Sequence, residues 1–128
     1  MAEIGIMVYG FTKDEAETIR TSLQDINKED VILISGCGRE DHLLGDILED
    51  ELYDTFEEKK DPRVVMFLGF DGKKINASMD DFPKLDGARP IFCTPTEKNI
   101  GWKLSALLED LMEEREYFRQ KQREKRQS

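Results

Sequence analysis

The sequence predicts a single three-layer α/β domain, in which helices cover both faces of a mainly parallel, four-stranded sheet. Four short, nearly all-apolar segments alternate with segments whose apolar residues recur at helical spacing. The order of these segments in the first half recurs in the second half, which indicates a duplicated β-α-β-α unit. A chain of 128 residues is long enough to form one such core.

A strand and a helix are expected first. Residues 4–9 are almost entirely apolar, as is typical of a strand buried on both faces, and Gly10 and Phe11 end this strand. Thr12 and Glu15 then form a capping box, because the Thr12 hydroxyl and the Glu15 carboxylate can each accept a hydrogen bond from an unpaired backbone N–H. A helix with apolar residues at helical spacing is expected to start here.

A second strand and a second helix are expected next. Residues 31–34 are apolar, and a Ser-Gly-Cys-Gly turn breaks this strand. Six apolar residues at helical spacing then predict a helix over residues 41–58. Pro62 follows this helix and closes it, since proline cannot continue a helix.

The second half of the chain predicts the same elements. A strand is expected over residues 64–68, a weaker helix after Asp71, and a fourth strand over residues 90–93. A long helix, with apolar residues at helical spacing between Ile100 and Met112, comes last and leads into a basic tail.

Two local matches support the duplication. Residues 7–11 match residues 66–70, and residues 44–50 match residues 104–110, in the same order and at an almost constant offset. The alternative is that any two β-α-β-α stretches look alike. Because both halves contain the same short sequence matches in the same order, we favour the duplication.

One domain is expected over residues 1–116, with repeat halves of about residues 1–60 and 61–116. Residues 117–128 are expected to be a basic helical extension or a frayed tail. The six Lys and Arg residues after position 114 face only two Glu residues there, whereas the whole chain has a net charge of −9. The acidic body should repel nucleic acid and anionic lipid, so any such contact would fall to the tail.

Composition also predicts a cytoplasmic protein without a metal or cofactor. The apolar runs are far shorter than the roughly 20 residues that a membrane span needs, and the first residues lack the features of a secretory signal. Cys37 and Cys93 do not form a disulfide framework, so both are expected to be thiols. Together with the single His42 they fall short of a zinc site.

The predicted fold indicates where a ligand would bind. If each half pairs its own two strands and the halves join through the first and third strands, the strand order is 2-1-3-4. A pseudo-twofold axis then runs along the strands, with the first and third helices on opposite faces. In doubly wound, Rossmann-like sheets, ligands bind beyond the carboxyl ends of the strands, where the strand order reverses. Two segments are expected to lie there side by side, where they could bind a ligand: Gly10-Phe11-Thr12 and Gly69-Phe70-Asp71. The structural alternative, which we favour, is that each Gly-Phe only turns the chain and places a ring over the end of the sheet.

A second candidate ligand site precedes the last helix and consists of Thr94, Thr96, Asn99 and Trp102. A helix N-terminus lined with hydroxyl and amide groups can bind an anion. The structural alternative, which we favour, is that Asn99 caps the last helix by accepting a backbone N–H, while the Trp102 ring covers the end of the sheet.

The candidate catalytic residue is Cys37. It lies between two glycines just before a predicted helix, whose positive end could activate the thiol. The nearest possible base is His42, and Arg39 does not have the spacing of a phosphatase-like loop. We therefore favour a structural role for Cys37.

Three short motifs in the second half occur together in a known family. They are a strand that ends in Gly-Phe, a strand that runs into Thr-Pro, and an Asn-x-x-Trp sequence that opens a Leu- and Glu-rich helix: Gly69-Phe70, Thr94-Pro95 and Asn99 to Trp102. With these motifs, the stretch from Val64 to about Glu116 resembles an uncharacterised bacterial family, the domain of unknown function 3783. The resemblance implies an α/β fold and carries no activity with it.

No acid–base, metal-binding or nucleophile arrangement stands out in the sequence. The predicted function is therefore a non-enzymatic binding or regulatory module, which recognises a protein or small-molecule partner at the carboxyl edge of the sheet. Two alternatives stay open. One is a small enzyme or redox sensor that uses Cys37, and the other is a homodimeric scaffold joined through the last helix.

Overall fold

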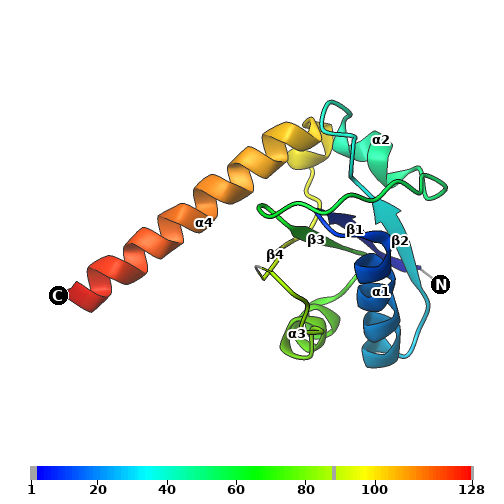
Figure 1. Ribbon diagram of the computed structural model, residues 1–128, viewed down its shortest axis with the longest axis horizontal. Helices are drawn as coiled ribbons and strands as arrows, with labels where there is room; N and C mark the ends of the chain where they lie inside the picture. The colour runs from blue at the N-terminus through cyan, green and yellow to red at the C-terminus, as the bar shows by residue number, and fades with distance from the viewer. Residues whose placement is uncertain (1–2, 88, 128) are drawn as a thin grey trace.

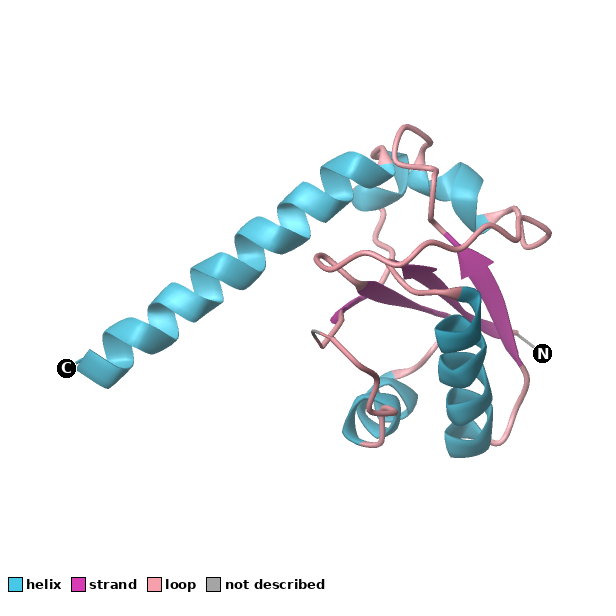
Figure 2. Ribbon diagram, in the orientation of Figure 1, coloured by secondary structure: helices cyan, strands magenta, loops and turns pink. Residues whose placement is uncertain are grey.

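Strands and helices alternate along most of the chain in the computed structural model, which describes residues 3–87 and 89–127 (Figures 1 and 2). The elements are β1 (Ile4–Tyr9), α1 (Lys13–Asn27), β2 (Val31–Ser35), α2 (Leu44–Leu48), β3 (Val64–Leu68), α3 (Gly72–Asp80), β4 (Ile91–Cys93), the 3-10 turn η1 (Asn99–Gly101) and α4 (Leu104–Gln127). The predicted capping box is confirmed. The Thr12 hydroxyl accepts from the Glu15 N–H at 3.1 Å, and the Glu15 carboxylate accepts from the Thr12 N–H at 3.0 Å.

The strands form one mixed sheet in the order β2-β1-β3-β4. β1 and β2 are parallel, as are β3 and β4, but β1 and β3 are antiparallel, with Met7 directly opposite Met66. The predicted strand order is confirmed, whereas the expected parallel junction between the halves is wrong. The connection from α2 to β3 explains the difference. It passes the carboxyl end of β1, where the Lys59 N–H donates to the Gly10 carbonyl at 3.0 Å, so β3 starts where β1 ends.

Helices cover both faces of the sheet, with α1 and α3 on one face and α2 and α4 on the other (Figure 1). The expectation that α1 and α3 lie on opposite faces is therefore wrong. Two crossovers of the same hand put their helices on one face when the strands that they leave run in opposite directions and the crossovers also move in opposite directions across the sheet, as in the order β2-β1-β3-β4. The antiparallel junction thus accounts for the placement of α3.

The helix expected over residues 41–58 is much shorter, because α2 spans only Leu44–Leu48. A continuous helix would bury its apolar residues on one face. Instead, Ile47 packs on the α4 side of the sheet, Phe56 packs on the α1 side, and Leu52 is 91% exposed. The chain after α2 is irregular and crosses the carboxyl end of β2, where the Ser35 hydroxyl donates to a carbonyl of this segment.

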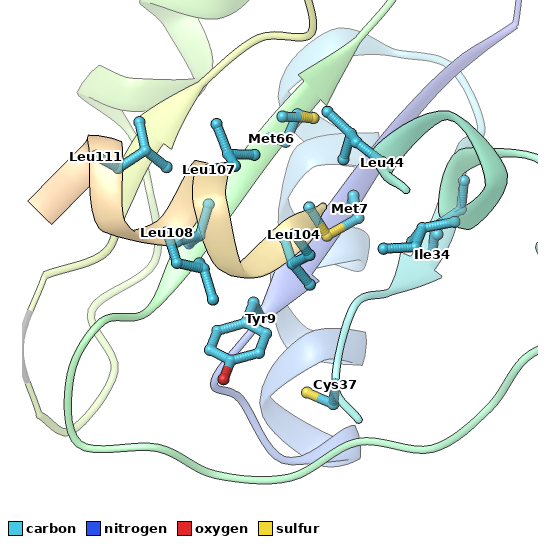
Figure 3. Packing of buried hydrophobic residues seen from close by; sticks show 12 residues of the cluster. Met7, Tyr9, Ile34, Cys37, Leu44, Met66, Leu104, Leu107, Leu108 and Leu111 are labelled. Carbon is cyan, nitrogen blue, oxygen red and sulfur yellow. The ribbon is translucent and has the colours of Figure 1, made fainter. Parts of the chain in front are cut away.

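The last helix, α4, is attached to the body through its first turns. Leu104 pairs with the chain before α2: its N–H donates to the His42 carbonyl at 3.0 Å, and the Leu44 N–H donates to the Trp102 carbonyl at 2.8 Å. Figure 3 shows α4 leucines packed beside Met7 over the centre of the sheet. The rest of α4 projects away from the domain as a single long helix (Figure 1).

None of the described helices has an apolar stretch of sufficient length to cross a membrane.

Candidate functional site

The two Gly-Phe turns lie at opposite ends of the sheet. A Cβ on Gly10 would meet the backbone of Pro62, before β3, at 2.9 Å, whereas one on Gly69 would meet the backbone of Glu3, before β1, at 3.0 Å. The expectation that the turns flank one pocket side by side is therefore wrong. The antiparallel junction is the reason, because it places the carboxyl end of β1 beside the amino end of β3.

One of the two turns does border a cavity. Phe11 is completely buried where β1 ends and where β3 and β4 begin, and the chain between α3 and β4 crosses over this end of the sheet. A cavity of about 300 Å³ lies between them. The described residues that line this Phe11 cavity are Phe11, Arg63, Phe82, Pro83, Lys84, Leu85, Gly87, Arg89 and Pro90.

Arg63 holds the wall of the Phe11 cavity in place. It is the residue just before β3, and its side chain is only 4% exposed. Its guanidinium lies 4.3 Å from the centre of the Phe11 ring, donates to the Glu15 carboxylate at 3.0 Å and donates to the Asp86 carbonyl at 2.6 Å. Arg63 therefore connects the start of α1 to the chain that covers the cavity.

Glu15 contributes to two of these connections at once. One carboxylate oxygen accepts from the Thr12 N–H at the start of α1, and the other accepts from Arg63. A carboxylate that receives a guanidinium and a backbone N–H forms charge-assisted hydrogen bonds, which are stronger than neutral ones. The capping box predicted from the sequence thus also anchors the cavity.

Gly87 allows the chain to approach Arg63 closely. Its φ angle is +94°, a conformation that other L residues rarely adopt, and a Cβ here would lie 2.5 Å from the Arg63 Nη1 atom. Both the backbone angle and the available space therefore require glycine at this position.

All the charged residues among the described lining are cationic, although the chain has 28 Asp and Glu against 19 Lys and Arg. Arg63 is buried, whereas Lys84 and Arg89 are exposed at the opening. The Arg89 guanidinium lies 5.4 Å from the centre of the Phe92 ring and donates to the Met79 carbonyl at 3.3 Å. The arrangement can accept an anionic group at the opening and an apolar or aromatic group on the inner wall.

Sequence reasoning placed only Phe11 of this lining in a candidate site. The residues that it missed are a single cation before a buried strand and a loop with two prolines and a glycine. The available signal was that Arg63 directly adjoins the apolar run of β3, because a charged residue next to a buried strand can itself be buried and then needs a partner.

The other polar residues predicted at the Gly-Phe turns have structural partners. The Thr12 hydroxyl belongs to the capping box of α1, and the Asp71 carboxylate accepts from the Lys74 N–H at 2.8 Å as the N-cap of α3. Phe70 packs on Phe67 with 4.9 Å between the ring centres.

The second predicted cluster forms a tight turn before α4. The Asn99 side-chain oxygen accepts from the Thr96 N–H at 2.7 Å, while the Thr96 hydroxyl accepts from the Asn99 N–H at 3.0 Å. The Asn99 amide also donates to the Thr94 carbonyl at 3.4 Å. The expectation that Asn99 caps the last helix is therefore wrong: its side-chain oxygen accepts a backbone N–H in the turn around η1, and α4 starts only at Leu104. Trp102 packs against the core on the α4 side.

Cys37 is completely buried in this core, and α2 starts only at Leu44. The position expected for Cys37, directly before a helix, is therefore wrong. Its Sγ atom lies 3.5 Å from the Glu57 carbonyl, to which it donates, and His42 is exposed. Among the described residues, no group of His, Cys, Asp and Glu side chains is arranged to hold a metal ion.

Comparison with known proteins gave a match to one family model, which covers the cavity loop. No curated protein and no solved structure gave a match. The matched stretch starts at Arg63 and includes β3, α3, β4 and the attached turns of α4, so it contains every described cavity residue except Phe11. Residues 63–118 match the family model described as a domain of unknown function, number 3783.

Proposed function

We propose that this protein is a binding module whose ligand is a small organic anion with an aromatic or apolar part, held in the Phe11 cavity. The observation that supports this most strongly is the combination of three cations with an aromatic inner wall in an otherwise acidic protein. Ligand pockets typically combine apolar walls with a few polar groups that fix orientation. The site lies at the carboxyl end of β1.

The volume of about 300 Å³ suits a small ligand, since it is at the lower end of the range for ligand pockets. Phe82 and Leu85 are partly exposed and offer an aromatic and an aliphatic surface, whereas the Phe11 ring is completely buried in the wall. Lys84 and Arg89 are exposed at the opening, so their cationic groups are available to a carboxylate, sulfonate or phosphate. The described lining contains no carboxylate, imidazole, thiol or hydroxyl side chain, and we therefore propose binding without turnover.

Titration with 8-anilinonaphthalene-1-sulfonate tests this proposal, because the dye is an aromatic anion whose fluorescence rises in an apolar site. We expect saturable binding of one dye molecule to the wild-type protein. The double variant Lys84→Ala/Arg89→Ala should bind the dye about ten-fold more weakly, since each exposed cation contributes up to roughly 1 kcal/mol.

A second double variant, Lys73→Ala/Lys121→Ala, is the matched control. It removes the same two positive charges from exposed positions outside the cavity lining. Its dissociation constant should stay within about two-fold of the wild-type value. Equal weakening by both double variants would show that net charge alone attracts the dye, and the proposal would then be wrong.

We also infer that the halves arose by duplication, with a pseudo-twofold axis perpendicular to the sheet. Two backbone pairings support this. Met7 lies directly opposite Met66, and Leu43 bridges Lys103, so each pairing joins residues that the repeat aligns with each other. The halves differ at the chain between α3 and β4, which forms the cavity wall.

A further inference from the structure

The edge strand β2 borders an open groove. β2 pairs with β1 on one side only (Figure 1). The groove, of about 680 Å³, is lined by β2 and by the two segments that flank it. Val31, Ile32 and Leu33 lie along the groove, between α1 and residues 51–56. The groove is separate from the Phe11 cavity, because the two share no described lining residue.

The backbone of β2 presents hydrogen-bonding groups to this groove. Along a strand, successive residues direct their N–H and C=O groups to alternate sides. The Gly36 N–H donates to Val8 of β1, so Ile34 and Ile32 also face β1, whereas Val31 and Leu33 face the groove. The Val31 N–H is bonded to the Gln24 side chain at 3.1 Å. Leu33 therefore presents the central N–H and C=O of this edge to the groove.

β2 also lacks the features that usually protect an edge strand. Natural edge strands are kept from pairing by short length, proline, or charged residues. The other edge strand, β4, has three residues, with Pro90 directly before it and Pro95 shortly after it. β2 has the sequence Val-Ile-Leu-Ile-Ser, without proline or charge. The contrast indicates that the β2 edge is kept open for a partner strand.

The charges around the groove select the kind of partner. Its described lining has four carboxylates and one cation: Glu17, Asp30, Glu51, Asp54 and Arg20. Arg20 is already paired with Glu17, with N–O distances of 3.0 and 2.5 Å, and Asp54 is paired with Lys13 at 2.6 Å. The negative charge offered to a partner therefore comes mainly from Asp30 and Glu51. The apolar part of the lining includes Leu52, whose side chain is 91% exposed. A segment that alternates basic and apolar residues would match both properties.

We propose that the β2 edge binds an extended, basic segment of a partner protein by addition of a strand to the sheet. Backbone hydrogen bonds to Leu33 would supply affinity, and the carboxylates around the groove would supply the preference for Lys and Arg. This inference does not depend on the proposed ligand of the Phe11 cavity.

Fluorescence anisotropy with a labelled peptide of sequence Arg-Val-Lys-Val-Arg-Val-Lys tests the proposal. We expect saturable binding that weakens at least about ten-fold when alternate peptide nitrogens are methylated, because methylation removes backbone donors. A peptide with Glu in place of every Lys and Arg should not bind. Hydrogen exchange of the Leu33 amide should slow when the parent peptide binds. Equal binding of the methylated and parent peptides would overturn the proposal.

Two protein variants separate the edge from the overall charge. Leu33→Pro removes an outward N–H, which is tolerated best on an edge strand, and should abolish measurable peptide binding. Asp30→Lys/Glu51→Lys changes exposed residues and should weaken binding at least about ten-fold while circular dichroism stays unchanged. Unchanged affinity in this second variant would overturn the proposal even if Leu33→Pro failed to fold. A protein dimer that is lost in Leu33→Pro, without peptide binding to the wild type, would also overturn it, because a second copy would then occupy the edge.

Discussion

Replacing Arg63 by methionine should weaken the fold more than any comparable change at an exposed ion pair. Methionine keeps an unbranched apolar side chain but removes the guanidinium, which contacts the Phe11 ring, Glu15 and the Asp86 carbonyl. The start of α1 and the chain over the cavity would then lose their common anchor. The Glu15 carboxylate would also lose its cationic partner in a place where its side chain is only 19% exposed.

The structure sets the size of this effect. Removal of one partner of a buried ion pair costs about 3–5 kcal/mol, and hydrogen bonds to charged groups contribute roughly 1.5–3 kcal/mol each. Glu15 remains partly solvated and keeps the Thr12 N–H as a donor, which lowers the cost. We therefore expect Arg63→Met to reduce the free energy of unfolding by about 3 kcal/mol.

Arg115→Met is the matched control for this prediction. Arg115 forms a two-point ion pair with Asp61 at 2.8 and 2.6 Å, but these side chains are 21% and 44% exposed. Ion pairs of this kind contribute about 0–1 kcal/mol. Urea unfolding followed by circular dichroism measures both variants at neutral pH. Equal losses in the two variants, or a loss below about 1 kcal/mol for Arg63→Met, would refute the role given to Arg63.

Three further changes test other parts of the structure. Gly87→Ala should destabilise the protein by roughly 1–3 kcal/mol in urea and weaken dye binding, because the alanine Cβ would overlap the Arg63 guanidinium. Burial raises the pKa of the Cys93 thiol from 9.0 to about 12, so stability should be complete below pH 9 and fall between about pH 9 and 12. Cys93→Ala should remove roughly 1.4 kcal/mol of the stability lost between pH 8 and 10, and an unchanged pH dependence would contradict the burial of this thiol. Deletion of residues 117–128 should leave the unfolding midpoint within about 2 °C, because the buried part of α4 ends at Leu111, and the mass from light scattering should show whether the helix joins two copies.

Local sequence signals predicted the four strands and the start of α1, and the repeat predicted the order of the strands. Thr12 and Glu15 marked the start of α1 because a capping box is a short-range arrangement of side chains and neighbouring N–H groups. The apolar runs marked all four strands, most clearly β1 and β3, which are buried almost completely and leave few positions for polar residues.

Features that depend on contacts between distant parts of the chain were harder to predict from the sequence. An apolar run such as β3 has the same composition in either direction, so the sequence did not reveal that β1 and β3 are antiparallel. The spacing of Leu48, Leu52 and Phe56 fits a helix, but the side chains of these residues lie in different environments. The helix ends at Leu48. Both errors moved the expected site, because the location of a pocket depends on strand direction and on which segments cross the end of the sheet.

The cavity residues were hard to identify for a related reason. Arg63, Lys84 and Arg89 are separated in sequence by loops and by α3, and their common environment exists only after β4 has paired with β3. Asn99 was easier to interpret, because its hydrogen bonds reach only as far as Thr94 and Thr96.

The most direct test of the Phe11 cavity as the binding site is a two-dimensional proton–nitrogen NMR titration with 8-anilinonaphthalene-1-sulfonate. Binding in the cavity predicts saturable shifts concentrated at the amides of cavity-lining residues, with little change along β2: Phe11, Arg63, Phe82, Lys84, Leu85, Gly87 and Arg89. Shifts that centre on β2 or on Trp102, or that spread evenly over the chain, would contradict the account.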